Sequence, residues 1–363
     1  MRLASARGWL QTRQSSCGVS RSFAHGVTSP SSLRVKVRAW RLGFRSSNYY
    51  LYNLDRNDHT QYLPDAAVFS QGEVEGRFRR VLVDKVLFSA VMGAHVRVPE
   101  IVAIIARGRI CPTSTDLDVR DVKSLITHCE RANGVFIKPA RGIKGIQAHR
   151  LEVNRAGIVM NGEVMGVREV EKRLGGLDDF IVTNVIQQAV YAARIFPRSA
   201  NTLRIITMQD PDDGLRPFIP LATHRFGVNT SAPTDNWARG GLDAKIDLST
   251  GRLSHAKRNP KIDPGTHESH PDTGERIEGV EIPNWPLARQ AILDLAGTFG
   301  FLTFVGWDVI VTNDGVVVIE GNNPPSRAIQ KWQPFLTDER VRRFFEHHGA
   351  LKPRRGTKSM AAV

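Results

Sequence analysis

Apolar positions along this chain recur with two different periods, and these periods divide it into expected helices and strands. Apolar residues at helical spacing predict helices at residues 77–94, 116–132, 285–299 and 337–347. Short runs rich in β-branched and aromatic residues predict strands, among them 134–138, 180–186, 203–208, 218–226 and the hairpin 243–256. Strands and helices do not alternate strictly, so we expect an α+β fold with antiparallel or mixed sheets.

A hairpin near the end of the chain carries the most informative polar residues. Two β-branched runs flank Asn313-Asp314-Gly315, a turn sequence typical of hairpins. If all three residues form the loop, the register places Asp308 opposite Glu320, and Asn322 points to the same face. Two carboxylates and one amide on one face form the kind of oxygen set that Mg²⁺ prefers.

The alternative is an ordinary hairpin whose acidic residues face water. A two-residue turn would support that interpretation, because it shifts the register by one and separates Asp308 from Glu320. The neighbourhood favours the metal site. The flanking runs are rich in Val and Ile, where an unpaired carboxylate is costly. Two facing carboxylates would also repel each other without a cation.

The net charge of +14 is concentrated at the two ends of the chain. Residues 1–45 contain nine Lys and Arg and no acid, and residues 350–363 contain four and no acid. Removing these thirteen charges leaves a net charge of about +1 for residues 46–349. A nucleic-acid-binding domain would carry its charge on a folded face, so no specific nucleic-acid partner is expected.

Residues 1–45 are rich in Arg and Ser and match the composition of a mitochondrial transit peptide. The alternatives are a disordered extension or an upstream start codon in a bacterial gene. We favour these alternatives, and with them a cytoplasmic location over a mitochondrial one. The three cysteines form no disulfide framework. The longest apolar candidate, residues 86–96, is about half of what a bilayer needs, so no membrane span is expected. The oligomeric state is not encoded in any pattern we recognise.

Lys138 ends a predicted buried strand and precedes a loop that contains Gly142 and Gly145. A lysine above such a loop suits phosphate, because glycine amides allow close approach of the backbone. The alternative is a surface turn with solvated lysines. The chain has no Walker sequence, and no Gly-x-Gly-x-x-Gly follows a strand.

Taken in order, these motifs resemble the ATP-grasp superfamily across residues 84–327. They are Asp84-Lys85 at a helix start, Phe136-Ile137-Lys138-Pro139 with its glycine loop, and Asp308 followed by Glu320-x-Asn322. Asn236-Trp237-Ala238-Arg239-Gly240-Gly241 also resembles the Asn-x-x-Arg-Gly-Gly loop of glutamate ligases that modify ribosomal protein. The runs 199–204, 270–274 and 306–323 are similar to the sugar-transfer-associated, α-L-glutamate ligase-related ATP-grasp proteins.

The resemblance implies an ATP-grasp fold, in which two α+β subdomains with mostly antiparallel sheets clamp ATP after a short helical N-terminal region. The resemblance divides the chain into an extension at residues 1–45, a lead-in with a helix at 46–105 and an N-terminal subdomain at 106–182. A C-terminal subdomain with the metal site follows at 183–349, and a basic tail at 350–363.

The resemblance also implies a set of ligand-binding residues. Lys85 and Lys138 would hold the α and β phosphates, and the loop with Arg141, Gly142 and Gly145 would cover the phosphates. The linker 182–186 would lie along adenine, which implicates Asn184 and Val185. Family members usually carry a ribose-binding Glu near the linker end, where this chain offers Gln187. Magnesium, expected as two ions with Mn²⁺ as an alternative, would be held by Asp308, Glu320 and Asn322.

The implied reaction is an ATP-dependent ligation of a small-molecule carboxylate to an amine, through an acyl phosphate, with a saccharide, amino acid or peptide as acceptor. An arginine would stabilise the oxyanion that forms, and the candidates are Arg204, Arg225, Arg239 and Arg327. Arg225 and Arg239 are equally well read as solvated residues. His270 could contact substrate, but a lone His before Pro is more often a plain loop residue. The alternatives are a kinase-like ATP-grasp enzyme and a nucleotide-binding, non-enzymatic component of a polysaccharide pathway.

Overall fold

The computed structural model describes residues 32–68, 76–141, 147–325, 328 and 330–353. Contacts divide the chain into two units. The first contains Met1–Gly76, Asp210–Arg216 and Ser326–Val363, and the second contains Arg77–Gln209 and Pro217–Pro325. Both sheets lie essentially in the second unit, which also holds the residues discussed below as a candidate site.

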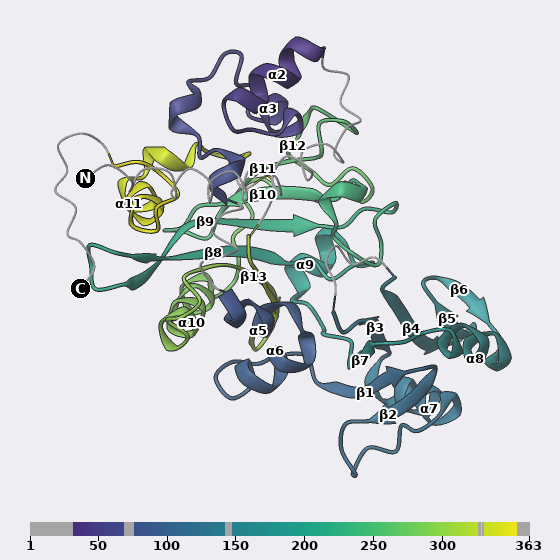
Figure 1. Cartoon of the computed structure of the whole chain (residues 1–363). Coiled ribbons are helices and arrows are strands. Elements are labelled where there is room, and N and C mark those ends of the chain that lie inside the picture. The colour runs from purple at the N-terminus through teal and green to yellow at the C-terminus, as the bar shows by residue number, and fades with distance from the viewer. Residues whose placement is uncertain (1–31, 69–75, 142–146, 326–327, 329, 354–363) are drawn as a thin grey trace. The chain divides into compact units, whose positions relative to one another are not determined.

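The first sheet has seven strands in the order β2-β1-β7-β3-β4-β5-β6, and every neighbouring pair is antiparallel (Figure 1). Helices α7, Val122–Ala132, and α8, Val167–Gly175, pack against this sheet and share its core. The strands are β1 Ile101–Ala106, β2 Arg109–Pro112, β3 Val135–Pro139, β4 His149–Asn154, β5 Gly157–Met160, β6 Glu163–Met165 and β7 Phe180–Asn184.

Helix α7 shows how the sequence sets an element's limits. The Asp121 side chain accepts a hydrogen bond from the Ser124 backbone N–H at 2.8 Å, and the Ser124 hydroxyl reaches back to the Asp121 backbone. This capping box starts the helix at Val122, later than the predicted residue 116. The helix ends at Asn133, which adopts the left-handed conformation that often closes helices.

The second sheet has the strand order β12-β11-β10-β9-β8-β13-β14. Helix α10, Trp285–Thr298, packs on it, and the buried indoles of Trp285 and Trp307 belong to its core. A shorter helix, α9, spans Val190–Ile195. The strands are β8 Leu203–Asp210, β9 Arg216–Phe226, β10 Leu242–Ile246, β11 Leu253–Lys257, β12 Thr266–His267, β13 Phe304–Thr312 and β14 Gly315–Asn322.

The β13–β14 hairpin confirms the expected pairing by a route that the sequence did not predict. Thr312 pairs with Gly315, so the loop has two residues, and the predicted three-residue loop is wrong. The register then shifts between Asp308 and Val309, because Ile319 is an extra residue in β14. This bulge restores the pairing of Asp308 with Glu320.

The helix predicted at residues 77–94 is wrong as a single element. The chain forms η2 Gly76–Arg79, α5 Arg80–Val83 and α6 Lys85–Met92, with a break at Asp84. Asp84 is extended, and its carboxylate accepts hydrogen bonds from the Val86 and Leu87 backbone N–H groups at 3.0 and 3.2 Å. A capping carboxylate therefore starts a new helix at Lys85.

The first unit contains α2 Leu33–Arg41, α3 Ser46–Leu51, η1 His59–Gln61, η4 Phe335–Thr337 and α11 Glu339–His347. Helix α2 therefore lies within the extension that the sequence suggested for residues 1–45. Helix α2 is held because Ala39 packs with Phe44, Tyr49 and Tyr52 in a small buried core. Among the described residues, no helix is long and apolar enough to cross a membrane.

Candidate active site

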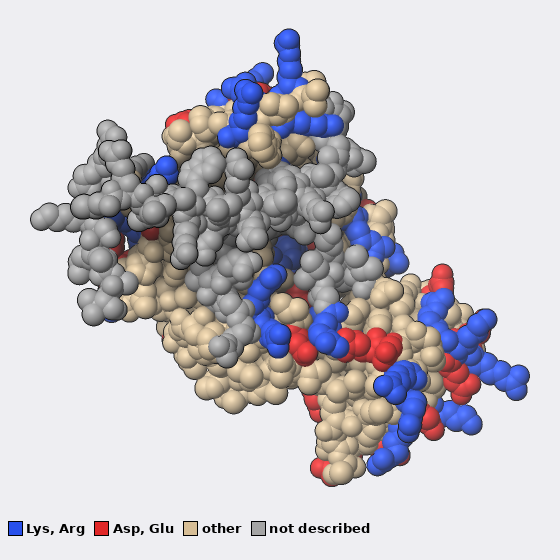
Figure 2. Space-filling view, in the orientation of Figure 1, with Lys and Arg blue, Asp and Glu red and all other residues tan. Residues whose placement is uncertain are grey.

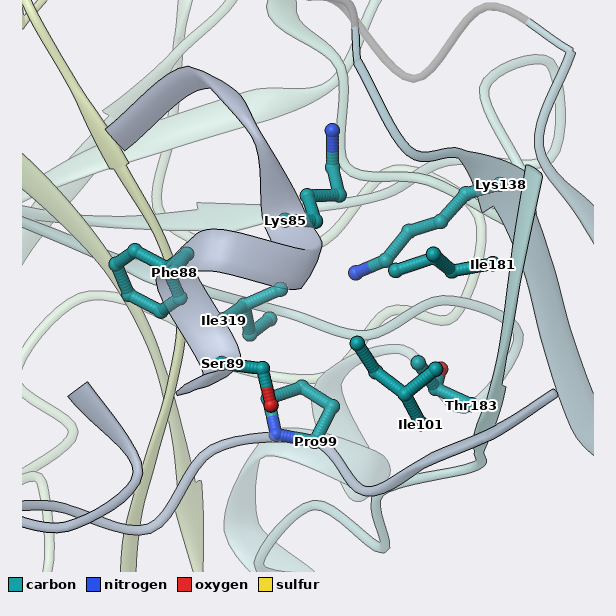
Figure 3. A pocket seen from close by; sticks show the side chains of 9 residues that line it. All are labelled: Lys85, Phe88, Ser89, Pro99, Ile101, Lys138, Ile181, Thr183 and Ile319. Carbon is teal, nitrogen blue, oxygen red and sulfur yellow. The ribbon is translucent and has the colours of Figure 1, made fainter. Parts of the chain in front are cut away.

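Two lysines from different elements line one pocket of the second unit (Figure 3). Lys85 is the first residue of α6 and is buried, and Lys138 comes from β3. The remaining walls are mostly apolar and come from α6, β1, β7, β14 and the segment before β1. These wall residues are Phe88, Ser89, Pro99, Ile101, Ile181, Thr183 and Ile319. We call this site the lysine pocket. It offers cationic groups beside an apolar slot.

Backbone contacts fix where Lys85 lies. Its backbone N–H donates to the Ala140 carbonyl at 3.0 Å, and Asp84 forms an isolated β-bridge with Arg141. The start of α6 is thereby attached to the chain just beyond β3. The Arg141 guanidinium donates to Asp179 at 2.8 Å and is largely exposed. The predicted phosphate-covering residues Gly142 and Gly145 lie outside the described residues.

Burial lowers the pKa of the Lys138 amine to about 8. The carboxylates of Glu320 and Asp308 oppose this shift, and the positive charge of Lys85 adds to it. The Lys85 Nζ atom lies 3.9 Å from Glu320 Oε2. An anion that entered the pocket would supply negative charge to two buried amines, so the pocket is suited to phosphate.

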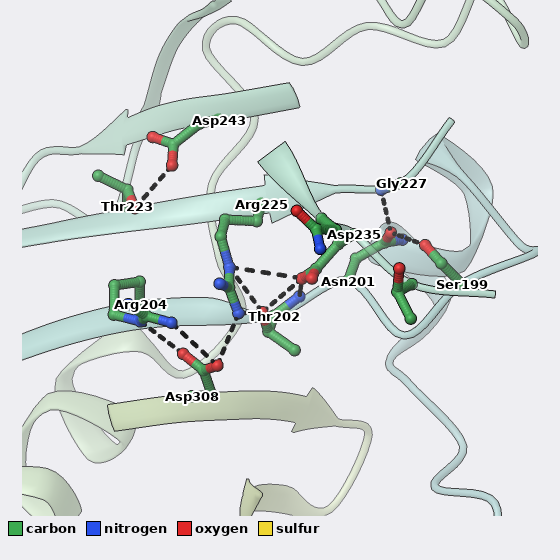
Figure 4. Close-up of polar contacts among 12 residues, drawn as sticks. Ser199, Asn201, Thr202, Arg204, Thr223, Arg225, Gly227, Asp235, Asp243 and Asp308 are labelled. Carbon is green, nitrogen blue, oxygen red and sulfur yellow. Dashed lines mark hydrogen bonds and ion pairs between the residues drawn. The ribbon is translucent and has the colours of Figure 1, made fainter. Parts of the chain in front are cut away.

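The Asp308 carboxylate lies between two arginines (Figure 4). Arg204 donates from Nε to Oδ1 at 2.5 Å and from Nη2 to Oδ2 at 3.1 Å, and Arg225 Nη2 lies 2.9 Å from Oδ2. Burial alone would raise the pKa of Asp308, but the two guanidinium groups hold it at about 2. Asp308 is therefore ionised at every physiological pH.

Asp235 supports Arg225 from the other side. Its Oδ2 atom lies 3.5 Å from Arg225 Nε and accepts hydrogen bonds from the Thr202 backbone N–H and hydroxyl, at 3.0 and 2.5 Å. Arg225 also donates to the Thr202 hydroxyl, at 3.0 Å from Nε. Burial lowers the pKa of Arg225, but Asp235 and Asp308 together raise it, so this guanidinium stays protonated. We call Arg204, Arg225, Asp235, Asp308 and Thr202 the arginine cluster.

Glu320 and Asn322 complete the predicted metal-binding set on β14. Glu320 pairs with Asp308 across the hairpin, and Asn322 Nδ2 lies 3.4 Å from Glu320 Oε1. Among the described residues, no three His, Cys, Asp or Glu side chains gather closely enough to hold a metal ion. Two carboxylates and an amide still fit Mg²⁺, which binds few protein oxygens and takes its other ligands from water and phosphate. Magnesium at these three residues stays a prediction.

The residues predicted along adenine are already hydrogen-bonded to α7 and to the residues just before β1 and β3. Asn184 Oδ1 lies 2.7 Å from His128 Nε2, and Asn184 Nδ2 donates to Glu100 at 2.8 Å. The Val185 backbone N–H donates to the Gly134 carbonyl at 3.3 Å. These bonds hold the linker in place beside the pocket strand β7. Gln187, predicted near ribose, has an exposed side chain.

The arginine predictions have different outcomes. Arg204 and Asp308 are brought together as described, whereas the Arg239 side chain is exposed on η3, Trp237–Arg239. Arg327 lies outside the described residues. Of the two readings of Arg225, the solvated one is wrong, because its side chain is only 17% exposed and is paired with Asp235 and Asp308. The apolar run of β9 around Arg225 was the available signal for its burial.

Asn201, in one of the family-like runs, is a structural residue. Its Nδ2 atom donates to the carbonyls of Ala192 and Phe196 at 2.9 and 2.7 Å. Its Oδ1 atom accepts from the Ser199 hydroxyl at 2.8 Å and the Gly227 backbone N–H at 3.1 Å. With four hydrogen bonds, the buried amide joins α9 to the start of β8 and the end of β9.

His270 has a similar structural role. Its ring is buried and stacks on Phe196, with 4.9 Å between ring centroids. Nε2 lies 2.7 Å from the Gly227 carbonyl, and Nδ1 accepts from the Asp272 backbone N–H at 3.2 Å. This bonding fixes a neutral tautomer, and burial lowers the pKa of the ring. His270 therefore anchors the long 257–284 connection.

The sequence profile of the sugar-transfer associated ATP-grasp proteins matches residues 70–333. The chain belongs to this family. The predicted family and the α+β ATP-grasp fold, with its two mostly antiparallel sheets, are confirmed. None of the curated proteins searched matches the chain.

Several solved structures are similar to this ATP-grasp chain. The ATP-grasp ligase PsnB, in complex with a precursor variant, Mg and ADP, is 12% identical, with a TM-score of 0.35 over 81% of this chain and 66% of that chain. The D-alanine–D-alanine ligase from Coxiella burnetii is 13% identical, with a TM-score of 0.35 over 74% and 58%. The D-cycloserine synthetase DcsG is 13% identical, with a TM-score of 0.39 over 74% and 69%. The chain covers less than two thirds of the length of the first two.

Proposed function

We propose that this ATP-grasp protein is an ATP- and magnesium-dependent ligase that joins a carboxylate to an amine through an acyl phosphate. The observation that carries the proposal is the lysine pocket together with the carboxylates of Asp308 on β13 and Glu320 on β14. Buried amines of Lys85 and Lys138 meet an apolar slot, and the carboxylates of Asp308 and Glu320 act on the same amine of Lys138. Family membership supports the same conclusion.

Two parts of the lysine pocket suit the two chemical parts of a nucleotide. The apolar side chains of Ile101, Ile181 and Ile319 suit a purine base, and the two amines suit phosphate oxygens. Magnesium, when bound at Asp308, Glu320 and Asn322, would neutralise charge on the phosphates and align the transferred phosphoryl group. The Lys138 amine would then be kept protonated by the anion that it binds.

The arginine cluster is suited to the second half of the reaction. An amine that attacks an acyl phosphate produces a tetrahedral oxyanion, and preformed donors stabilise such a charge. Arg204 and Arg225 are held rigidly by Asp308, and Asp235 orients Arg225. Arg204 is the proposed oxyanion donor, and we keep Arg239 and Arg327 as further candidates. The acceptor is proposed to be a saccharide, amino acid or peptide amine.

Hydroxylamine trapping tests this proposal. The protein is incubated with Mg·ATP, hydroxylamine and a panel of small carboxylates, and both ADP and acyl hydroxamate are measured. The proposed ligase gives ADP release that depends on one carboxylate, forms its hydroxamate, and stops when a chelator removes Mg²⁺. ADP release without hydroxamate from any carboxylate would favour a kinase-like enzyme. Nucleotide binding without turnover would favour a non-enzymatic role.

A further inference from the structure

Helix α2 of the first unit presents an exposed apolar stripe. Leu33, Val37 and Trp40 are 78%, 40% and 60% exposed, and their spacing of four and three residues places them on one side of the helix. The opposite side is the one that packs: Ala39 is fully buried, and Val35 contacts the small core of this unit. The stripe is therefore additional to what the fold requires of α2.

Cations flank this stripe on both sides. At 100° per residue, Lys36 lies on one flank and Arg34 and Arg41 lie on the other. The α2 sequence contains no acid. Within the described part of the chain, α2 forms an ion pair with Asp55, whose Oδ1 atom lies 3.4 Å from Arg38 Nη1 on the side away from the stripe. Figure 2 shows Lys and Arg side chains gathered over the part of the molecule that Figure 1 labels α2 and α3.

This arrangement matches the chemistry of a lipid interface. Apolar side chains enter the boundary between headgroups and acyl chains, and an indole such as that of Trp40 favours this depth. Lys and Arg at the edges of the stripe extend their charged ends towards anionic headgroups. We propose that α2 docks the chain reversibly on an anionic lipid surface.

Area and charge favour lipid over another macromolecule. Three exposed side chains on a nine-residue helix offer far less area than the roughly 800 Å² that each partner buries in a stable protein interface. A nucleic acid would use the cations but would leave Leu33 and Val37 in water. An anionic bilayer uses both features together. One short helix gives weak binding by itself, so the predicted association is reversible and sensitive to salt.

Vesicle co-sedimentation of the full chain tests this proposal. We expect binding to vesicles of phosphatidylcholine with 30% phosphatidylglycerol, and at least tenfold weaker binding to phosphatidylcholine alone. Trp40→Glu and the double change Lys36→Glu/Arg41→Glu should each weaken binding at least tenfold. The matched control is Leu287→Ala, at a residue of α10 that is 70% exposed, and it should bind like the parent. Circular dichroism verifies that each variant is folded.

A second readout locates the contact. Trp40→Phe should keep most of the binding but remove the blue shift of tryptophan fluorescence that vesicles induce in the parent. The proposal is overturned if the parent ignores both kinds of vesicle, or if Trp40→Glu binds as well as Leu287→Ala. It is also overturned if the α2 changes abolish self-association or nucleic-acid binding and leave vesicle binding intact. None of these measurements needs nucleotide, so their failure would not affect the proposed ligase activity.

Discussion

The arginine cluster and the lysine pocket are neighbouring charged regions that differ in how their charges are balanced. In the arginine cluster, Asp308 and Asp235 directly contact the guanidinium groups that they neutralise. In the lysine pocket, Lys85 Nζ lies 3.9 Å from Glu320 Oε2, and burial lowers the pKa of Lys138 to about 8. The difference suggests a division of labour, with a preorganised scaffold beside a site that a bound anion completes.

The first way to test this comparison is to remove a cation from the scaffold. Arg225→Leu leaves Asp235 and part of Asp308 buried without their partner, and this typically costs about 3–5 kcal/mol of folding stability. Urea unfolding measures the change. The matched control is Arg97→Leu, which removes an exposed pair with Asp314 and should cost less than about 1 kcal/mol. Equal effects of the two changes would show that the cluster is not a preorganised scaffold.

Removing a cation from the pocket should affect function more than stability. Lys138→Ala deletes a buried, poorly compensated amine, so the folded state loses little. We expect kcat/KM for ADP release to fall at least 100-fold, which corresponds to about 2.7 kcal/mol of lost transition-state stabilisation. The urea midpoint should stay close to that of the parent. A variant with a clearly lower urea midpoint than the parent but an unchanged kcat/KM would contradict this division.

The pH dependence of nucleotide binding sharpens the comparison further. The phosphate-binding form of Lys138 is the protonated one, whose pKa in the free protein is about 8. Affinity should therefore be nearly constant below pH 7 and fall about fivefold between pH 8 and pH 9. In Lys138→Arg, the guanidinium stays protonated and the profile should be flat over this range. Equilibrium dialysis at several pH values measures both profiles, and a parent profile as flat as that of the variant would refute the assignment.

The smallest effect on nucleotide binding is expected at a residue that belongs to neither region. His270→Ala removes the ring contacts with Gly227 and Asp272 that hold the 257–284 connection. The expected loss is roughly 1–3 kcal/mol of stability, with unchanged nucleotide affinity in the remaining folded protein. Thermal unfolding with and without ATP distinguishes the two quantities. A specific loss of affinity would mean that His270 contacts ligand after all.

The sequence predicted the family, the antiparallel sheets and the Asp308–Glu320 pairing, because short motifs and β periodicity are local. It did not predict the bulge at Ile319, since a one-residue insertion in a uniformly apolar strand leaves the pattern of side chains unchanged. The sequence also predicted a single helix where the structure has α5 and α6, separated at Asp84. A capping residue inside an apolar run does not interrupt the helical spacing of the apolar positions.

The ion-pair partners within the arginine cluster could not be predicted from the sequence, for a different reason. Asp235 lies ten residues from Arg225 and 73 before Asp308, and only the sheet order brings β8, β9 and β13 together. The burial of Arg225 followed from its apolar run, but its partners did not. Long-range ion pairs depend on strand order and register, and neither is encoded near the charged residue.

Calorimetric titration of Mg·ATP into the purified protein tests the central claim most directly. The account predicts one nucleotide per chain, with affinity lost in Lys85→Ala/Lys138→Ala and retained in a control that removes an exposed lysine of α8, Lys172→Ala. Absence of binding heat and of competition with a labelled nucleotide would contradict it. Equal binding by the double variant and the Lys172→Ala control would contradict it as well.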